Sequence, residues 1–333
     1  MADAARGRAS TQAVGGWPEL PLAAWRETCE TLHLWTQIVG KVRLAKTPWQ
    51  NHGWHVALYV TARGLTTSPI PDADRSFEIA FDFVDHALDI SVSDGRRVRL
   101  GLVPQAVADF YERLMRALND DLGLAVAIDE RPCEIPGAVP FAADRRHASY
   151  DAEWAHRFFQ ALVRVDRTFK LFRTGFLGKC SPVHFFWGSF DLAVTRFSGR
   201  RAPLFARDVP GVARGVMQEA YSHEVSSAGF WPGGSGVDAS FYAYAYPLPG
   251  TFRGARVHPE SARFDDTLGE FLLPYEAVRA AADPAGTLLA FLQSTYVAAA
   301  DAAQWERSEL ERPLGVAGVC PDVGATHPSA DAS

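Results

Sequence analysis

The feature of this sequence that most constrains its fold is a pattern that occurs twice, 134 residues apart. Four positions in a strand-like region repeat without a gap: Pro48, Leu58, Val60 and Thr61 match Pro182, Leu192, Val194 and Thr195. The apolar stripe of the preceding helix-like region keeps the same spacing: Trp35, Ile38 and Val42 match Phe169, Phe172 and Phe176. The sequence therefore predicts an α+β fold made of an internally duplicated unit of helix, antiparallel β-meander and helix.

Helix signals frame both units. Apolar residues at helical spacing predict a helix over residues 22–46, which Pro48 ends. In the second unit, Ser149 or Asp151 can cap a helix that runs to about Thr174. Asp283-Pro284 predicts a break, with a last helix over about 284–306.

Alternating apolar residues predict the strands. In the first unit they lie at 54–61, 77–83, 88–92 and 98–102, with a tight turn at Asp94-Gly95 and a short closing strand at 124–128. In the second unit the longest strand-like run covers 180–199, followed by strands at about 221–230 and 240–246. The two antiparallel sheets are expected to pack side by side or to form one curved sheet, with helices on one face.

The expected organisation has five segments. These are a disordered tail over 1–16, a first repeat over 17–131, a Pro-rich linker over 132–148, a second repeat over 149–312 and a disordered tail over 313–333.

Charge and composition narrow the function classes. A net charge of −6 and a pI near 5.9 argue against a nucleic-acid partner. No apolar run reaches the roughly 18 residues of a membrane span, and no secretory signal is visible. Four widely spaced cysteines without a Cys-x-x-Cys pair indicate reduced thiols. A soluble, cytoplasmic protein is expected, and the sequence assigns no oligomeric state.

Several long stretches resemble the signature of an uncharacterised bacterial domain-of-unknown-function family. They are HLWTQIVGKVRL (33–44), HASYD (147–151), SPVHFFWGSFD (181–191) and SHEVSSAGFWPGG (222–234). The resemblance covers about residues 17–310, and it implies no activity.

The run over 180–199 carries the first candidate site. If it is one extended strand, Ser189 and Asp191 point to one side with Trp187, and His184 and Arg196 lie on the other side. Aromatic side chains around a Ser and an Asp are typical of a ligand pocket. The alternative is a second buried face in which an arginine pairs with Asp191.

Ser222-His223-Glu224 raises the possibility of a metal site, because His and Glu side chains bind zinc or iron. In a regular strand, however, His223 and Glu224 point in opposite directions, and the chain has no His-Glu-x-x-His motif. The sequence therefore assigns neither a metal nor a cofactor.

The first hypothesis for function is a small-molecule pocket in the second repeat, at its junction with the first. Asp191, His223 and Glu224 are the candidate catalytic residues, and in an enzyme His223 or Asp191 would act as general base. The candidate substrate-binding residues are His55, His184, Trp187, Ser189, Arg196 and Trp231, with Arg196 holding an anionic group of the substrate.

Two alternatives remain open at this point, a non-catalytic binding or scaffold protein and a His-dependent metalloenzyme. A pocket requires four side chains to converge on one cavity, whereas in a scaffold they scatter or form ion pairs. These four are His184, Asp191, His223 and Glu224.

Overall fold

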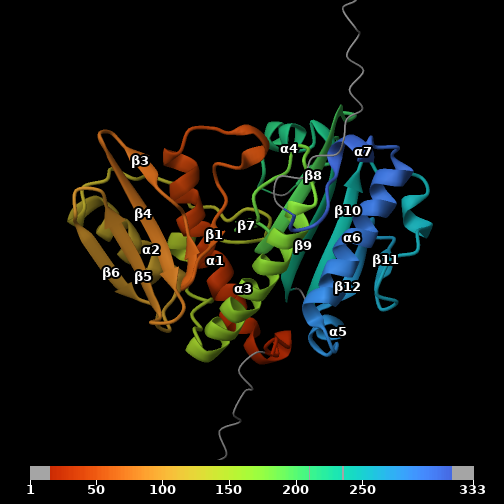
Figure 1. The fold of residues 1–333 in the computed structure, drawn as a ribbon. Helices are drawn as coiled ribbons and strands as arrows, with labels where there is room; N and C mark the ends of the chain where they lie inside the picture. The colour runs from red at the N-terminus through yellow and green to blue at the C-terminus, as the bar shows by residue number, and fades with distance from the viewer. Residues whose placement is uncertain (1–15, 210, 235, 317–333) are drawn as a thin grey trace, which may run out of the picture.

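The computed structural model describes residues 16–209, 211–234 and 236–316. Its helices pack against two antiparallel sheets (Figure 1), which confirms the predicted α+β class. Most of the two expected tails, residues 1–15 and 317–333, lies outside the described residues. The start of the second tail packs on the protein, because the Gly315 amide donates to the Thr174 hydroxyl over 2.8 Å.

The first sheet has the order β1-β2-β4-β5-β6, and β3 pairs with β4. Its strands are β1 (Tyr59–Val60), β2 (Gly64–Thr66), β3 (Ile70–Asp72), β4 (Arg75–Asp82), β5 (Ala87–Val92) and β6 (Arg97–Gly101). Phe77, Ile79 and Phe81 of β4 are buried at alternate positions, as the sequence predicts. The turn at Asp94-Gly95 is also present, and Gly95 adopts φ +95° there.

The second sheet has the order β11-β12-β10-β9-β8-β7. Its strands are β7 (His184–Phe186), β8 (Asp191–Arg201), β9 (His223–Gly234), β10 (Val237–Tyr246), β11 (Arg263–Asp265) and β12 (Glu270–Pro274). The long β9–β10 hairpin forms the centre of this sheet.

The helices are α1 (Leu22–Lys46), α2 (Val107–Arg116), α3 (Ala152–Thr174), α4 (Arg214–Ala220), α5 (Tyr275–Arg279), α6 (Pro284–Ala302) and α7 (Arg307–Leu310), with short turns η1 (Asn51–Gly53), η2 (Ala117–Asp121), η3 (Phe141–Ala143) and η4 (Phe252–Gly254). Helices α1, α3 and α6 begin and end close to the positions that the sequence predicts. The Asp151 carboxylate caps α3 by accepting from the amides of Glu153 and Trp154. Asp283 caps α6, which confirms the predicted break at Asp283-Pro284.

Helix α1 lies between the two sheets, and α3 and α6 lie in front of the second one (Figure 1). The side chain of Trp35 on α1 is fully buried and stacks on Phe110 of α2, with 4.6 Å between ring centroids. Trp25, nearer the start of α1, packs on Phe158 of α3. Because truncation of such aromatic side chains costs about 3–5 kcal/mol, these contacts anchor both units to α1.

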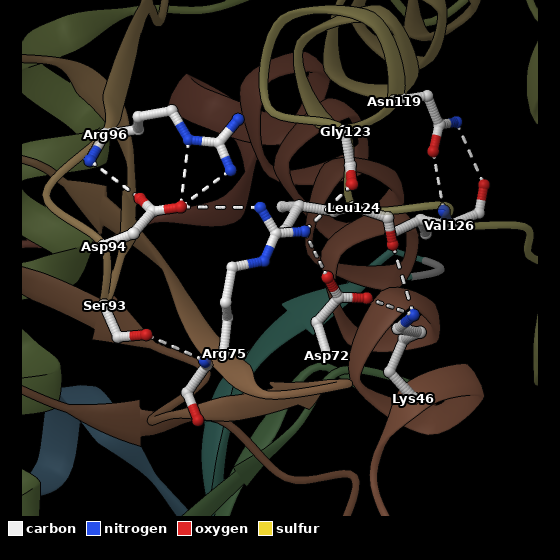
Figure 2. Close-up of polar contacts among 11 residues, drawn as sticks. Lys46, Asp72, Arg75, Ser93, Asp94, Arg96, Asn119, Gly123, Leu124 and Val126 are labelled. Carbon is white, nitrogen blue, oxygen red and sulfur yellow. Dashed lines mark hydrogen bonds and ion pairs between the residues drawn. The ribbon is translucent and has the colours of Figure 1, made fainter.

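The C-terminal end of α1 is held by a polar network (Figure 2). The buried Asp72 carboxylate on β3 accepts from Lys46 over 2.6 Å and from Arg75 over 2.7 Å. Lys46 and Arg75 also donate to the carbonyls of Leu124 and Gly123, respectively. The network therefore fixes α1, the first sheet and the segment after η2 to one another.

The inner edges of the two sheets meet at a single isolated bridge. Leu58, just before β1, and Phe185, in the middle of β7, exchange both backbone hydrogen bonds over 2.8 and 2.7 Å. Both side chains are fully buried. This reciprocal pair connects the sheets through their first strands.

The two sheets share one strand order, a meander of five consecutive neighbours (β1-β2-β4-β5-β6 and β7-β8-β9-β10-β12) to which one extra strand is added. Sheet order equates β1 with β7, whereas the offset of 134 residues pairs Leu58 with Leu192 on β8. The residue-by-residue alignment therefore does not follow the sheet order. Duplication of the whole unit remains a prediction.

The prediction of one continuous strand over 180–199 is wrong. Residues 187–190 form a turn between β7 and β8, and Phe190 adopts φ +61°. Helix α1 stabilises this turn, because the side chains of His33 and Gln37 both contact the Gly188 carbonyl oxygen, at 2.8 and 3.2 Å. A carbonyl occupied in this way is not free for a strand ladder.

Two shorter strand predictions are also wrong for a related reason. In the predicted strand 54–61, only Tyr59–Val60 pairs regularly, since the Val56 carbonyl accepts from the Trp187 indole over 2.8 Å and the Ala57 carbonyl accepts from Arg43. Residues 124–128 form no strand, because the amide and carbonyl of Val126 bond to the Asn119 side chain (Figure 2). Side chains take the backbone groups that a neighbouring strand would need.

Candidate functional site

A cavity of about 470 Å³ lies at the junction of the two units. One face of the second sheet forms its floor, with side chains from β7, β8, β9 and β10. Its walls come from α1, the loop 49–56, the segment 129–134, and α4 with the residues just before it. A site of this volume can hold a small organic molecule.

The floor follows from strand alternation. Asp191, Ala193, Thr195 and Phe197 of β8 face the cavity, while Leu192, Val194 and Arg196 point to the opposite face, where α3 and α6 pack. The turn at 187–190 folds β7 back beside β8, so that His184 pairs with Ala193 in the ladder. His184 therefore shares the cavity face with Asp191, whereas an uninterrupted strand would have separated them.

Asp191 is the most unusual polar group of the floor. The residue is 5% exposed, and its carboxylate accepts from the Ser189 hydroxyl over 2.5 Å and from the Tyr242 hydroxyl. No Lys or Arg among the described residues pairs with it. Burial raises the pKa of this carboxyl, although the two hydroxyl donors act in the opposite direction.

A second carboxyl, Glu134, lines the cavity from the linker. The residue is exposed to solvent, but the protein around its carboxyl, with a further contribution from the charge of Asp191, raises its pKa to about 7. A Cβ atom on Gly188 would lie 2.1 Å from its Oε1 atom, so Glu134 rests directly on the turn that precedes Asp191. The cavity therefore contains a buried acid on its floor, Asp191, and a solvent-exposed acid on its wall, Glu134, whose charges influence each other.

The three histidines of the cavity are held neutral. Burial, followed by the charge of Arg43, lowers the pKa of His184 to about 3. The pKa values of His52 and His55 are also lowered, again chiefly by burial. The Nδ1 atom of His184 is buried and has no hydrogen-bond partner in the described part of the chain. Such an unsatisfied group is costly unless a ligand or water completes it.

Aromatic rings form most of the remaining lining, from Trp49, Trp54, Phe186, Trp187, Phe197, Tyr221, Tyr242 and Tyr244. Two of these rings, Trp187 and Tyr242, occupy space that a side chain at a neighbouring glycine would fill. A Cβ atom on Gly40 would lie 2.1 Å from the Trp187 indole nitrogen, and a Cβ atom on Gly229 would lie 2.2 Å from the Tyr242 hydroxyl. These glycines allow the rings to approach the backbone of α1 and β9 closely.

Gln37 of α1 holds two walls together. Its side-chain amide donates to the Cys133 carbonyl and its oxygen accepts from the Cys133 amide, both over 2.9 Å. The same amide contacts the Gly188 carbonyl over 3.2 Å. Because Gln37 is fully buried, it fixes the linker and the turn relative to α1.

Of the residues singled out from the sequence, five line this cavity: His55, His184, Trp187, Ser189 and Asp191. Four do not: Arg196, His223, Glu224 and Trp231. Of the four side chains that the pocket hypothesis required to converge, His184 and Asp191 do so and His223 and Glu224 do not.

Arg196 lies on the opposite face of the sheet, contrary to its expected place in the pocket. The residue is 1% exposed, and its guanidinium packs against the rings of Phe172 and Tyr296, 3.5 and 4.3 Å from their centroids. One nitrogen donates to the Phe172 carbonyl. Burial lowers its pKa to about 10. In this position the side chain cannot hold a substrate group in the cavity.

The other three residues lie near the rim or away from the cavity. Glu224 pairs with Arg200 over 2.7 Å and accepts from Ser198, so it belongs to a surface ion pair. The His223 ring lies 6.3 Å from that of His52, and its Nδ1 contacts Ser222. Trp231 lies on β9, opposite Ser240 of β10.

No three His, Cys, Asp or Glu side chains are grouped closely enough to hold a metal ion in the part of the chain that the structure describes. Within the same ranges, no helix combines the length and the apolar character needed to cross a membrane.

The sequence did not single out Glu134. It lies in a Pro-rich segment that was read as a linker, and its left-handed backbone (φ +60°) has no periodic signal. Tyr242 and Tyr244 are on a strand that did show alternation, Tyr-Ala-Tyr-Ala-Tyr. That pattern identifies a face but not which side of the sheet a ligand would occupy.

Comparison with known proteins gives one match. Residues 17–312 match a family of unknown function (DUF5996). No curated protein and no solved structure matches the chain.

Proposed function

The chain belongs to the DUF5996 family, whose function is unknown, and we propose that it binds a small organic molecule in the cavity between its two units. The observation that carries this proposal is the Asp191 carboxyl, buried on the cavity floor, hydrogen-bonded by Ser189 and Tyr242, and without a basic partner among the described residues. A buried acid in such a position is costly for folding alone.

The rest of the lining supports the same proposal. A ligand pocket combines apolar walls with a few directed polar groups. Here the aromatic rings supply the walls, and Asp191, Glu134 and the unpartnered Nδ1 of His184 supply the polar groups. Groups with perturbed pKa values that gather in one cavity are also typical of functional sites.

The test is a thermal-shift screen of a diverse small-molecule library, followed by calorimetry. A ligand at about 100 times its Kd should stabilise the protein by roughly 2.7 kcal/mol. Ala193→Phe, which fills the floor of the cavity, should abolish the effect. Ala142→Phe, on the exposed turn η3, is the matched control and should retain it. The proposal fails if no compound binds, or if compounds bind Ala193→Phe equally well.

An acid–base reaction is a second candidate, which Glu134 favours. A carboxyl with a pKa of about 7 can both accept and donate a proton near neutral pH. Asp191 or Glu134 would then act as the base toward a bound substrate. Turnover of a compound found in the screen, lost in Glu134→Gln with binding retained, would establish this role.

A further inference from the structure

We propose that the ligand of this cavity is an organic ammonium ion with an apolar body, whose charged nitrogen lies at Asp191 and Glu134 and whose body lies against the aromatic rings. This inference rests on the proposed function and adds the chemical class of the ligand.

The side chains that line the cavity carry more acidic than basic groups. Three acids line the cavity, Asp191, Glu134 and Asp129, against one basic side chain, Lys41. Lys41 lies 3.8 Å from the largely exposed Asp129, which leaves the buried Asp191 and the exposed Glu134 without a cation among the described residues. A bound ammonium ion would supply the missing positive charge.

The aromatic walls of the cavity can also bind a cation. A cation is attracted to the face of an aromatic ring within about 6 Å of its centroid. The structure already shows such contacts, because the ammonium of Lys179, which does not line the cavity, lies 5.5 Å from the Trp54 ring and 5.1 Å from the Phe197 ring. Both rings also line the cavity, together with Trp49 and Trp187. The same rings provide flat surfaces for an apolar body.

An anionic ligand fits this cavity poorly. Its charged group would lie beside Asp191 and Glu134, and the histidines, whose pKa values are lowered, would offer it no positive charge. Arg196, the one buried cation on β8, lies on the far face of the sheet. The unpartnered Nδ1 of the neutral His184 imidazole can hydrogen-bond an N–H group of the ligand.

The experiment compares matched compounds that share one body and differ in charge. Tryptamine, indole-3-ethanol and indole-3-propionate form one set, and phenethylamine, 2-phenylethanol and 3-phenylpropionate form another. Calorimetry should give affinities at least about tenfold higher for the amines than for the alcohols, and no binding of the carboxylates. The amines should also release protons from the two acids, seen as binding enthalpies that differ between phosphate and Tris buffers.

Two variants test the residues. Asp191→Asn should remove most of the preference for amines over alcohols. Asp82→Asn is the matched control, because Asp82 is an equally buried carboxylate that pairs with Arg63 outside the cavity. If Asp191→Asn does not fold, Glu134→Gln on the linker should reduce both the amine preference and the proton release.

The outcomes separate the two proposals. Alcohols or carboxylates that bind as tightly as the amines would overturn the ammonium ligand and leave the small-molecule pocket standing. If none of these compounds binds and the broad library also gives no ligand, both proposals are wrong. If the library yields only neutral or anionic ligands and no amine, the ammonium ligand is wrong and the small-molecule pocket stands.

Discussion

Gly229 on β9 lies directly opposite Tyr242 on β10, and a Cβ atom at Gly229 would lie 2.2 Å from the Tyr242 hydroxyl oxygen. That hydroxyl donates to the Asp191 carboxylate. Because Gly229 on β9 has no side chain, Tyr242 on β10 can reach Asp191 on β8 and donate a hydrogen bond to it.

Gly229→Ala should therefore displace the Tyr242 ring and weaken its bond to Asp191. We expect a loss of about 1–3 kcal/mol in the free energy of unfolding and a fall of roughly tenfold in affinity for any cavity ligand. Urea denaturation and calorimetry measure the two effects. Gly101→Ala on β6 is the control, since its Cβ would meet only Val103 at 3.7 Å. Equal behaviour of the two variants would contradict the role of Gly229.

Gly40→Ala on α1 should destabilise the protein although alanine is normally the better helix residue. The new methyl group would collide with the Trp187 indole, which donates to the Val56 carbonyl over 2.8 Å. We expect a cost of about 1–3 kcal/mol, measured by chemical denaturation. Gly215→Ala on α4 has open space around its Cβ and should be neutral or stabilising. A stabilised Gly40→Ala would show that Trp187 does not pack as described.

Asp72→Asn should destabilise the protein at neutral pH by about 1–3 kcal/mol, because both Lys46 and Arg75 lose a charged acceptor (Figure 2). Burial opposes ionisation of Asp72, but the two cations outweigh it and hold its pKa below the ordinary 3.8. Its contribution is therefore present above about pH 4 and is lost as the pH falls through the lower pKa of the folded state.

The measurement for Asp72 is urea denaturation of both proteins between pH 7 and pH 3. The difference in stability should shrink as the pH falls below 4. Asp74→Asn, an exposed residue two positions along the chain, should show no comparable difference. If the difference in the free energy of unfolding between wild type and Asp72→Asn does not change with pH, the ion pairs are not its cause.

Arg196→Met should leave ligand binding in the cavity unchanged, because the guanidinium lies on the opposite face of the sheet between Phe172 and Tyr296. Replacing a buried charge with a flexible apolar side chain often has a small net effect on stability. Calorimetry with any compound from the screen checks this. A loss of affinity with an unchanged thermal midpoint would restore Arg196 as a ligand-binding residue.

Much of the secondary structure could be predicted, because its signals are local. The apolar stripe of α1, the alternation in β4 and the Asp283-Pro284 break each depend on residues within one element. The predictions failed where a distant side chain occupies backbone groups. Asn119 takes those of Val126, and His33 and Gln37 take the carbonyl of Gly188.

The same cause limited the prediction of the site. Alternation within β8 correctly separates Asp191 from Arg196, but the unseen turn after β7 reversed the side assigned to His184. Glu134 could not be found from a periodic pattern, since its position depends on Gln37 of α1 and on the space above Gly188. Contacts between the units determine these positions, and a single strand or helix does not encode them.

The bridge between Leu58 and Phe185 also prevents copies of the chain from associating through exposed sheet edges. Each sheet would otherwise end in an unpaired first strand, and such edges recruit other chains. A fragment ending in the linker would expose one of these edges and lose most of the cavity lining. The two fragments should therefore complement each other when mixed and aggregate when kept apart.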